Sequence, residues 1–162
     1  MGGLVALLLS GAEVGAGLFS GPDPNWREGE IVYPPAFSGE GLREFYVSAA
    51  SPNRFLVDEN SLSVDSDGVV RYVLVVRTSG GAENVTFEGI RCESGERRIY
   101  ATARADGGWS PARRSGWEPI GSGSYNQPRS ALARNYFCDG STMARDRAEV
   151  LRKLREAVRI LP

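Results

Sequence analysis

Histidine is absent from this 162-residue sequence. The imidazole group is the commonest general base in enzymes and the commonest metal ligand, so its absence excludes the usual Ser–His and Cys–His mechanisms. A serine–lysine pair does not replace it, because the residue three positions before Lys153, the only lysine, is Val150. We therefore expect no catalytic residue, no metal site and no cofactor.

The chain also lacks a strong net charge and a long hydrophobic run. Its 19 basic and 20 acidic residues give a formal net charge of −1, which provides no overall field to attract nucleic acid. The longest apolar run near the N-terminus, residues 4–9, is too short for a transmembrane helix, and Glu13 follows it closely. The length suits a single domain.

The first residues resemble the end of a secretory signal. An apolar run, residues 4–9, precedes Ser10, Gly11 and Ala12, which are small residues suited to cleavage after Ala12. We predict a truncated signal segment over residues 1–12, a loop-like lead-in over 13–33 and a single globular domain over 34–162. The first arginine is Arg27, so the usual basic start of a signal is lacking and an uncleaved apolar tail is the alternative.

Two long strands form the centre of the predicted fold. Residues 69–78 and 84–92 are rich in β-branched and aromatic residues and flank a Gly80–Gly81 turn. We predict a register with Val73 opposite Glu88, which places Tyr72 and Phe87 on one face. The same register places Arg71 diagonally beside Glu88 on the other face, as a structural ion pair.

The other segments complete an α+β pattern. Strands are expected at 42–49, 54–57 and 97–104, and a long irregular connection at 106–123. A short helix is expected at 131–137, and a second helix from Met143, capped by Ser141 or Thr142. The predicted fold is a curved antiparallel sheet of about five strands packed with one or two C-terminal helices.

Several of these segments are similar to the cryptic neisserial protein-like family, over roughly residues 34–138. The segments that carry the resemblance are Asp58–Val64, Asp67–Tyr72 and Asn84–Cys92, with Tyr100–Ala101 and the spaced Trp109 and Trp117. The resemblance implies a small exported protein of Gram-negative bacteria, periplasmic or otherwise outside the cytoplasm. It implies no activity, cofactor or catalytic residue.

Cys92 and Cys138 are the only cysteines. An even number of cysteines in an exported protein favours a disulfide, and a pair of buried free thiols is the alternative. The bridge would attach the end of the second central strand to the C-terminal helical region. We therefore expect the helices to lie on the face of the sheet that carries Cys92.

The irregular connection contains the best candidate for binding. Trp109 and Trp117 flank the adjacent Arg113 and Arg114. Indole faces stack on sugars or peptide side chains, and two guanidinium groups can bind carboxylate or phosphate. The alternative is that both indoles cover the core while the arginines are merely solvated.

Acidic residues provide a second, catalytic hypothesis. Glu88, Asp58 and Glu59 could supply the paired carboxylates of a histidine-free hydrolase acting on cell-wall glycan. The run from Asp65 to Gly68 has the opening of a calcium loop but lacks its closing glutamate, so we expect a plain turn.

The sequence thus predicts an exported cell-envelope protein that acts as a non-catalytic binding or structural module. Its partner would be an envelope component: a protein, a glycan or a lipid head group. The hydrolase is the alternative. Two exposed carboxyls about 5–10 Å apart in a cleft would favour catalysis.

Overall fold

The computed structural model describes residues 21–158 and has one large antiparallel sheet. The strand order is β1-β2-β4-β5-β6-β7, with β3 beside β4 and β8 beside β6. The strands are β1 (Leu42–Phe45), β2 (Arg54–Asp58), β3 (Ser63–Val64), β4 (Val69–Arg77), β5 (Glu83–Arg91), β6 (Glu96–Ala103), β7 (Trp109–Pro111) and β8 (Glu118–Pro119). The five longer strands are those predicted, and three short ones raise the total to eight.

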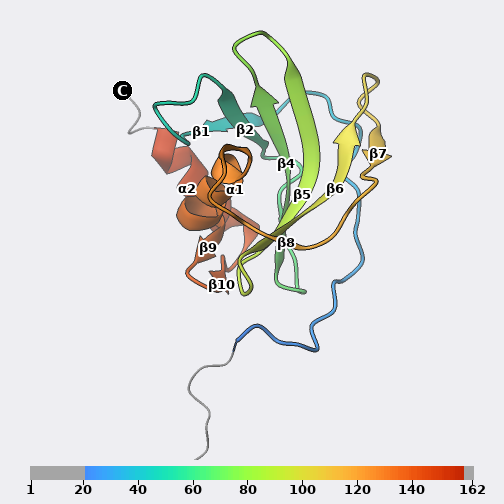
Figure 1. The fold of residues 1–162 in the computed structure, drawn as a ribbon, viewed down its shortest axis with the longest axis vertical. Helices are drawn as coiled ribbons and strands as arrows, with labels where there is room; N and C mark the ends of the chain where they lie inside the picture. The colour runs from blue at the N-terminus through green and yellow to red at the C-terminus, as the bar shows by residue number, and fades with distance from the viewer. Residues whose placement is uncertain (1–20, 159–162) are drawn as a thin grey trace, which may run out of the picture.

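The C-terminal part is helical and lies against one side of the curved sheet (Figure 1). Its elements are the 3₁₀ turn η1 (Ser124–Asn126), α1 (Gln127–Leu132), the π-helical turn η2 (Ala133–Phe137), the small hairpin β9 (Cys138–Asp139) and β10 (Thr142–Met143), and α2 (Arg147–Val158). The α+β prediction, a sheet with two C-terminal helices, is confirmed. Within residues 21–158, no helix is long and apolar enough to cross a lipid bilayer.

The last helix starts later than predicted. The proposed caps Ser141 and Thr142 belong to the β9–β10 hairpin, and α2 begins at Arg147. Asp146 provides the cap instead, since its Oδ1 accepts a hydrogen bond from the backbone N–H of Glu149 at 2.8 Å. A side-chain acceptor at this position satisfies one of the free N–H groups of the first turn.

The register of the central hairpin differs from the prediction by one residue. Tyr72, and not Val73, lies opposite Glu88, and Val73 lies opposite Phe87. Because side chains alternate across a strand, this shift moves Phe87 to the opposite face from Tyr72 and places Glu88 beside Tyr72. The predicted Arg71–Glu88 ion pair is therefore wrong, since the two side chains lie on opposite faces of the sheet.

Each face of the sheet carries a separate apolar cluster. The helix face contributes Val70, Tyr72, Leu74 and Ile90, which pack against Leu132, Phe137 and Leu154 of the helical region. The opposite face, here called the strap face, contributes Val73, Val75, Phe87 and Tyr100. A sheet buried on both sides explains why β4 reads as an almost continuous apolar run.

An N-terminal strap, residues 21–37, covers the strap face. It has no regular secondary structure, and Ile31 and Phe37 pack against the apolar cluster of that face. The Phe37 N–H donates to the Gly107 carbonyl at 2.8 Å, and the indole N–H of Trp109 donates to the Pro34 carbonyl at 2.9 Å. The predicted signal segment, residues 1–12, lies outside the described residues.

The predicted disulfide is confirmed. Cys92 and Cys138 are bonded, with their Cα atoms 5.6 Å apart. Both half-cystines belong to the helix-face cluster, so the bridge attaches the sheet to the chain between η2 and β10. The helices cover the face that carries Cys92, as expected, but the register shift makes this the face of Tyr72 and not that of Arg71 and Val73.

Loss of this bridge should lower stability substantially. The cysteines are 46 positions apart, and the loop-entropy model gives about 4 kcal/mol for a cross-link of that span. Urea unfolding of the Cys92→Ala/Cys138→Ala variant should show a free energy of unfolding lower by about this amount. Reductant should destabilise the wild type but not the variant. Coincident unfolding curves for the two proteins would contradict the expectation.

Candidate functional site

A fully buried carboxylate lies at the centre of the helix face. Glu88 of β5 has no exposed surface. Its Oε2 accepts hydrogen bonds from the Tyr72 hydroxyl at 2.9 Å and from Arg129 Nε at 2.8 Å. Its Oε1 accepts from Thr86 Oγ1 at 2.6 Å and from Arg129 Nη2 at 2.5 Å. Four donors thus satisfy both carboxylate oxygens, as a buried charge requires.

Arg129 of α1 completes this ion pair and orders the turn before the helix. Its Nη1 donates to the carbonyl oxygen of Tyr125 at 2.5 Å, and its guanidinium lies 4.4 Å from the centre of the Tyr125 ring. Burial alone would lower the pKa of Arg129, but the Glu88 carboxylate raises it above its ordinary value. Burial, and then the adjacent Glu88 charge, raise the pKa of Tyr72.

A cleft with a volume of about 790 Å³ opens beside this ion pair. It lies between the start of the helical region and the sheet, and the segment 48–53 forms its third side. Thr86 and Arg129 line the cleft directly, so the ordered ion pair forms part of its wall. The volume lies within the range of about 300–1,000 Å³ that small-molecule sites occupy.

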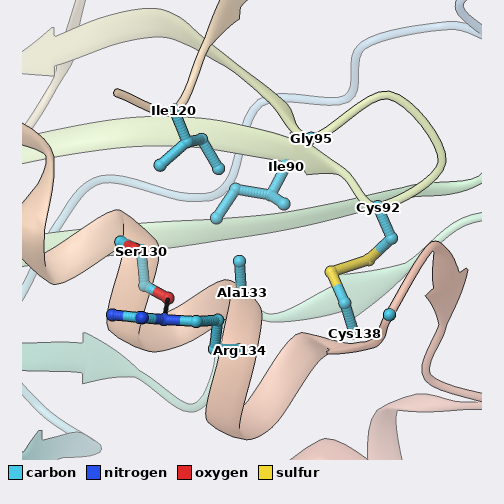
Figure 2. A pocket seen from close by; sticks show the side chains of 9 residues that line it. Ile90, Cys92, Gly95, Ile120, Ser130, Ala133, Arg134 and Cys138 are labelled. Carbon is cyan, nitrogen blue, oxygen red and sulfur yellow. Dashed lines mark hydrogen bonds between the residues drawn. A yellow bond between two sulfur atoms is a disulfide. The ribbon is translucent and has the colours of Figure 1, made fainter. Parts of the chain in front are cut away.

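A second, smaller groove lies further along the helical region. Figure 2 shows Ile90 and Ile120 on the sheet side facing Ala133, with the disulfide at one end. Its volume is about 300 Å³. Its apolar lining and lower volume make it a weaker candidate than the cleft at Arg129.

A different set of charged residues joins the strap to the opposite face. Arg71 is 3% exposed and binds Asp65 Oδ2 at 2.6 Å and Asp67 Oδ2 at 2.7 Å. Its third partner is Glu28 of the strap, at 3.1 Å. Asp67 also accepts the Gly29 N–H at 2.9 Å. The predicted turn at residues 65–68 therefore directs its carboxylates toward a guanidinium.

Glu28 itself is the main anchor of the strap. It accepts hydrogen bonds from Arg98, from the Tyr100 hydroxyl and, at 3.1 Å, from the indole N–H of Trp117. A β-bulge between β5 and β6 places Tyr100 between the strap and Gly89. A Cβ at Gly89 would lie 2.5 Å from the Tyr100 hydroxyl oxygen, so this strand position requires glycine.

The two tryptophans of the predicted binding loop take part in this attachment. Trp109 and Trp117 are half-buried, and both indole N–H groups bind the strap. Trp117 also packs edge-on against Trp26, with ring centres 5.6 Å apart. Arg113 and Arg114 are exposed. None of the four predicted residues lines the cleft at Arg129.

The three carboxylates of the catalytic hypothesis each bind different partners. Glu88 is paired with Arg129, whereas Glu59 binds Arg43 at 2.8 Å and Arg155 at 2.8 Å. Asp58, the last residue of β2, accepts the Asn60 N–H at 2.8 Å, and burial raises the pKa of its carboxyl. The described fold does not bring the three together in the cleft, whose lining contains none of them.

Sequence reasoning did not find Arg129, Tyr125 or Glu28. Arg129 and Glu88 are separated by 41 residues, and Glu28 and Arg98 by 70 residues. One signal was available for the first pair, since a glutamate in a β-rich strand needs a buried partner. The predicted register, which differs from the observed one by one residue, made Arg71 the partner of Glu88 instead.

A family model matches most of this chain. The model described as the CNP1-like family matches residues 22–155, which include nearly all of the strap, the whole sheet, α1 and most of α2. The chain belongs to the CNP1-like family. This confirms the resemblance noted in the sequence.

One curated protein is a distant relative of this chain. The chain is similar to "Cryptic neisserial protein 1" of Neisseria gonorrhoeae (strain ATCC 700825 / FA 1090), with 27% identity over 142 residues. The matched region covers 79% of this chain and 70% of the relative. No solved structure matches the chain.

The Glu88–Arg129 pair of this CNP1-like protein should show strong coupling. Arg129→Met leaves a buried carboxylate without its cation, which should cost about 3–5 kcal/mol of unfolding free energy. Glu88→Leu combined with Arg129→Met should cost much less than the sum of the two single changes. Denaturant unfolding of the four proteins provides the measurement.

An exposed ion pair serves as the control for this cycle. Arg54 and Glu44 have side chains that are 60% and 42% exposed. Arg54→Met with Glu44→Gln should change the free energy of unfolding little, because solvent screens such pairs. Additive losses at Glu88 and Arg129 would show that the pair does not act as a unit.

The strap attachment should weaken in acid. Burial alone would raise the pKa of Asp67, but its bonds to Arg71 and to the Gly29 N–H leave the pKa below its ordinary value of 3.8. A lowered pKa in the folded state stabilises the fold above the unfolded value and is lost as the pH falls through the folded value. Stability should therefore decline as the pH falls below about 4.

The Asp67→Asn variant tests this pH dependence. Its unfolding free energy should fall less between about pH 5 and about pH 2 than that of the wild type, because the variant lacks the carboxyl group whose protonation favours unfolding. Asp139→Asn, at an exposed carboxylate in β9, serves as the control, and the change in the profile should be larger in Asp67→Asn than in this control. An unaltered profile for Asp67→Asn would contradict the assignment.

Proposed function

We propose that this CNP1-like protein is a non-catalytic binding protein of the bacterial cell envelope, with its ligand in the cleft at Arg129. The observation that carries the proposal is the cleft itself. It is large, its three sides are formed by the sheet, the segment 48–53 and the start of the helical region, and the Glu88–Arg129 pair fixes one wall. A rigid wall lowers the entropy lost when a ligand binds.

Export to the periplasm is supported by the disulfide. Such bonds persist in oxidising compartments and are rare in the cytosol. Cys92 and Cys138 are bonded, and the segment 1–12 has the pattern of a signal. Protein recovered from the periplasmic fraction should have both thiols blocked, as measured by intact mass before and after reduction and alkylation. Recovery from the cytoplasm alone would contradict export.

The state of Glu88 favours binding over hydrolysis. Its two oxygens already accept four hydrogen bonds from Tyr72, Thr86 and Arg129. A general base or nucleophile must be free to approach the substrate, and Glu88 would first have to break these bonds. Glu59 is held by two arginines in the same way.

The carboxylate-dependent hydrolase is the alternative, and one observation favours it. Burial raises the pKa of Asp58, as expected for a general acid. Glycoside hydrolysis needs a second carboxyl opposite the first. Conversion of a cell-wall glycan by the wild type but not by Asp58→Asn would support the alternative.

Arg113 and Arg114 form a second proposed contact. They are exposed on the connection between β7 and β8, which the strap holds through the two tryptophans. Binding residues concentrate on loops that a rigid sheet supports. Their role would be to bind an anionic group on an envelope partner.

A blocked cleft should abolish function without loss of the fold. Thr102 is exposed on β6 and lines the cleft, so Thr102→Trp would fill it. Thr142→Trp is the matched control, because Thr142 is exposed in a strand outside the cleft. The first variant should fail to complement a deletion strain, the second should succeed, and both should melt within a few degrees of the wild type.

The same assay separates the two proposed contacts. Arg113→Ala/Arg114→Ala should reduce complementation or partner capture while leaving stability nearly unchanged, because exposed arginines contribute little to it. Full complementation by Thr102→Trp with failure of the double arginine variant would place binding at the loop. Full complementation by both variants would contradict binding at either surface.

A further inference from the structure

The cleft at Arg129 is lined by groups that form hydrogen bonds without carrying charge. Ser51, Thr102 and Ser124 supply hydroxyls, and Asn53, Asn84 and Gln127 supply amides. Each of these groups can both donate and accept. A ligand that matches this lining must itself offer donors and acceptors from many directions.

The single charged residue of the lining does not give the cleft a net charge. Arg129 is 4% exposed, and its guanidinium binds both oxygens of Glu88. Positive and negative charge therefore cancel within one buried pair. An anionic ligand would gain little at this wall, because the Glu88 carboxylate bound to the guanidinium offsets much of its attraction.

An aromatic ring stands at the rim of the cleft. Tyr125 is 60% exposed, although large apolar side chains are usually buried. Its backbone carbonyl and its ring are both held by Arg129, so the exposed ring has a fixed place. A flat aromatic surface beside amides and hydroxyls can pack against the C–H face of a sugar ring, while the sugar hydroxyls bind the polar groups.

The sheet topology argues against a peptide bound as an added strand. That mode needs a free strand edge. The strands that line the cleft are β2, β4, β5 and β6, and each of them is paired on both sides. Apart from the β6 side of residues 83–85 at the start of β5, their backbone groups are therefore already used.

We infer that the cleft binds a short stretch of neutral glycan, with Tyr125 as the stacking surface and the surrounding hydroxyl and amide side chains as hydrogen-bonding partners. The inference rests on the proposed function, because it names the ligand class for the same cleft. It covers both acetamido sugars and plain hexoses, which share this chemistry.

Titration with defined oligosaccharides tests the inference. N-acetylchitohexaose and maltohexaose represent the two sources of neutral glycan, and oligogalacturonate of equal length represents an anionic one. NMR spectra of the ¹⁵N-labelled protein should show shifts centred on Thr102, Tyr125 and Gln127 with at least one neutral probe. The affinity should be insensitive to salt, since no net charge is involved.

Two tyrosine variants locate the contact. Tyr125→Ala should weaken binding of the neutral probe by about tenfold or more, as expected for a central aromatic contact. Tyr46→Ala is the matched control, because Tyr46 is 53% exposed and lies outside the cleft. It should leave the affinity unchanged. Circular dichroism spectra should be the same for both variants and the wild type.

Failure of this inference is distinguishable from failure of the proposed function. If no neutral probe binds at millimolar concentration while Thr102→Trp still abolishes complementation, the glycan assignment is overturned and the cleft remains a binding site. Preference for oligogalacturonate with strong salt dependence would also overturn it. Equal loss of affinity in Tyr46→Ala and Tyr125→Ala would place the glycan outside the cleft.

Discussion

The buried pair of Glu88 and Arg129 is the interaction on which the helical half of this protein depends. It joins the middle of β5 to α1 through two hydrogen bonds, and the Glu88 carboxylate is fully buried. The same guanidinium holds the carbonyl and ring of Tyr125. One desolvated ion pair therefore sets the position of a helix, the rim of a cleft and the charge of its wall.

The two covering layers are attached to the sheet by the same kind of contact. On one side a sheet carboxylate, Glu88, binds an arginine of the helical region, and on the other a sheet arginine, Arg71, binds Glu28 of the strap. Apolar packing alone is non-directional. The charged pairs add direction, since each can form with only one placement of the covering segment.

The strand pattern and the cysteine pair made the sheet, the two helices and the disulfide predictable. The register was not predictable, because a carboxylate on an apolar face is costly without a partner, whereas the folded chain buries Glu88 with Arg129 as its partner. Long-range partners leave no periodicity in the sequence, so the strap contacts of Glu28 and the cleft were missed as well. Trp109 packs against the apolar cluster of the strap face, as the alternative of a core lid has it, whereas Trp117 contacts Glu28 and Trp26 of the strap.

The strap has a consequence for the order of assembly. Residues 21–37 precede every described strand in the sequence, yet their partners Arg71, Arg98 and Trp117 lie much later in the chain. Until these contacts form, the strap does not cover the Phe87 side of the sheet. Contacts between segments so far apart form late in folding. Closure of the strap is thus expected as a final step, and a chain halted before it would expose an aggregation-prone apolar surface.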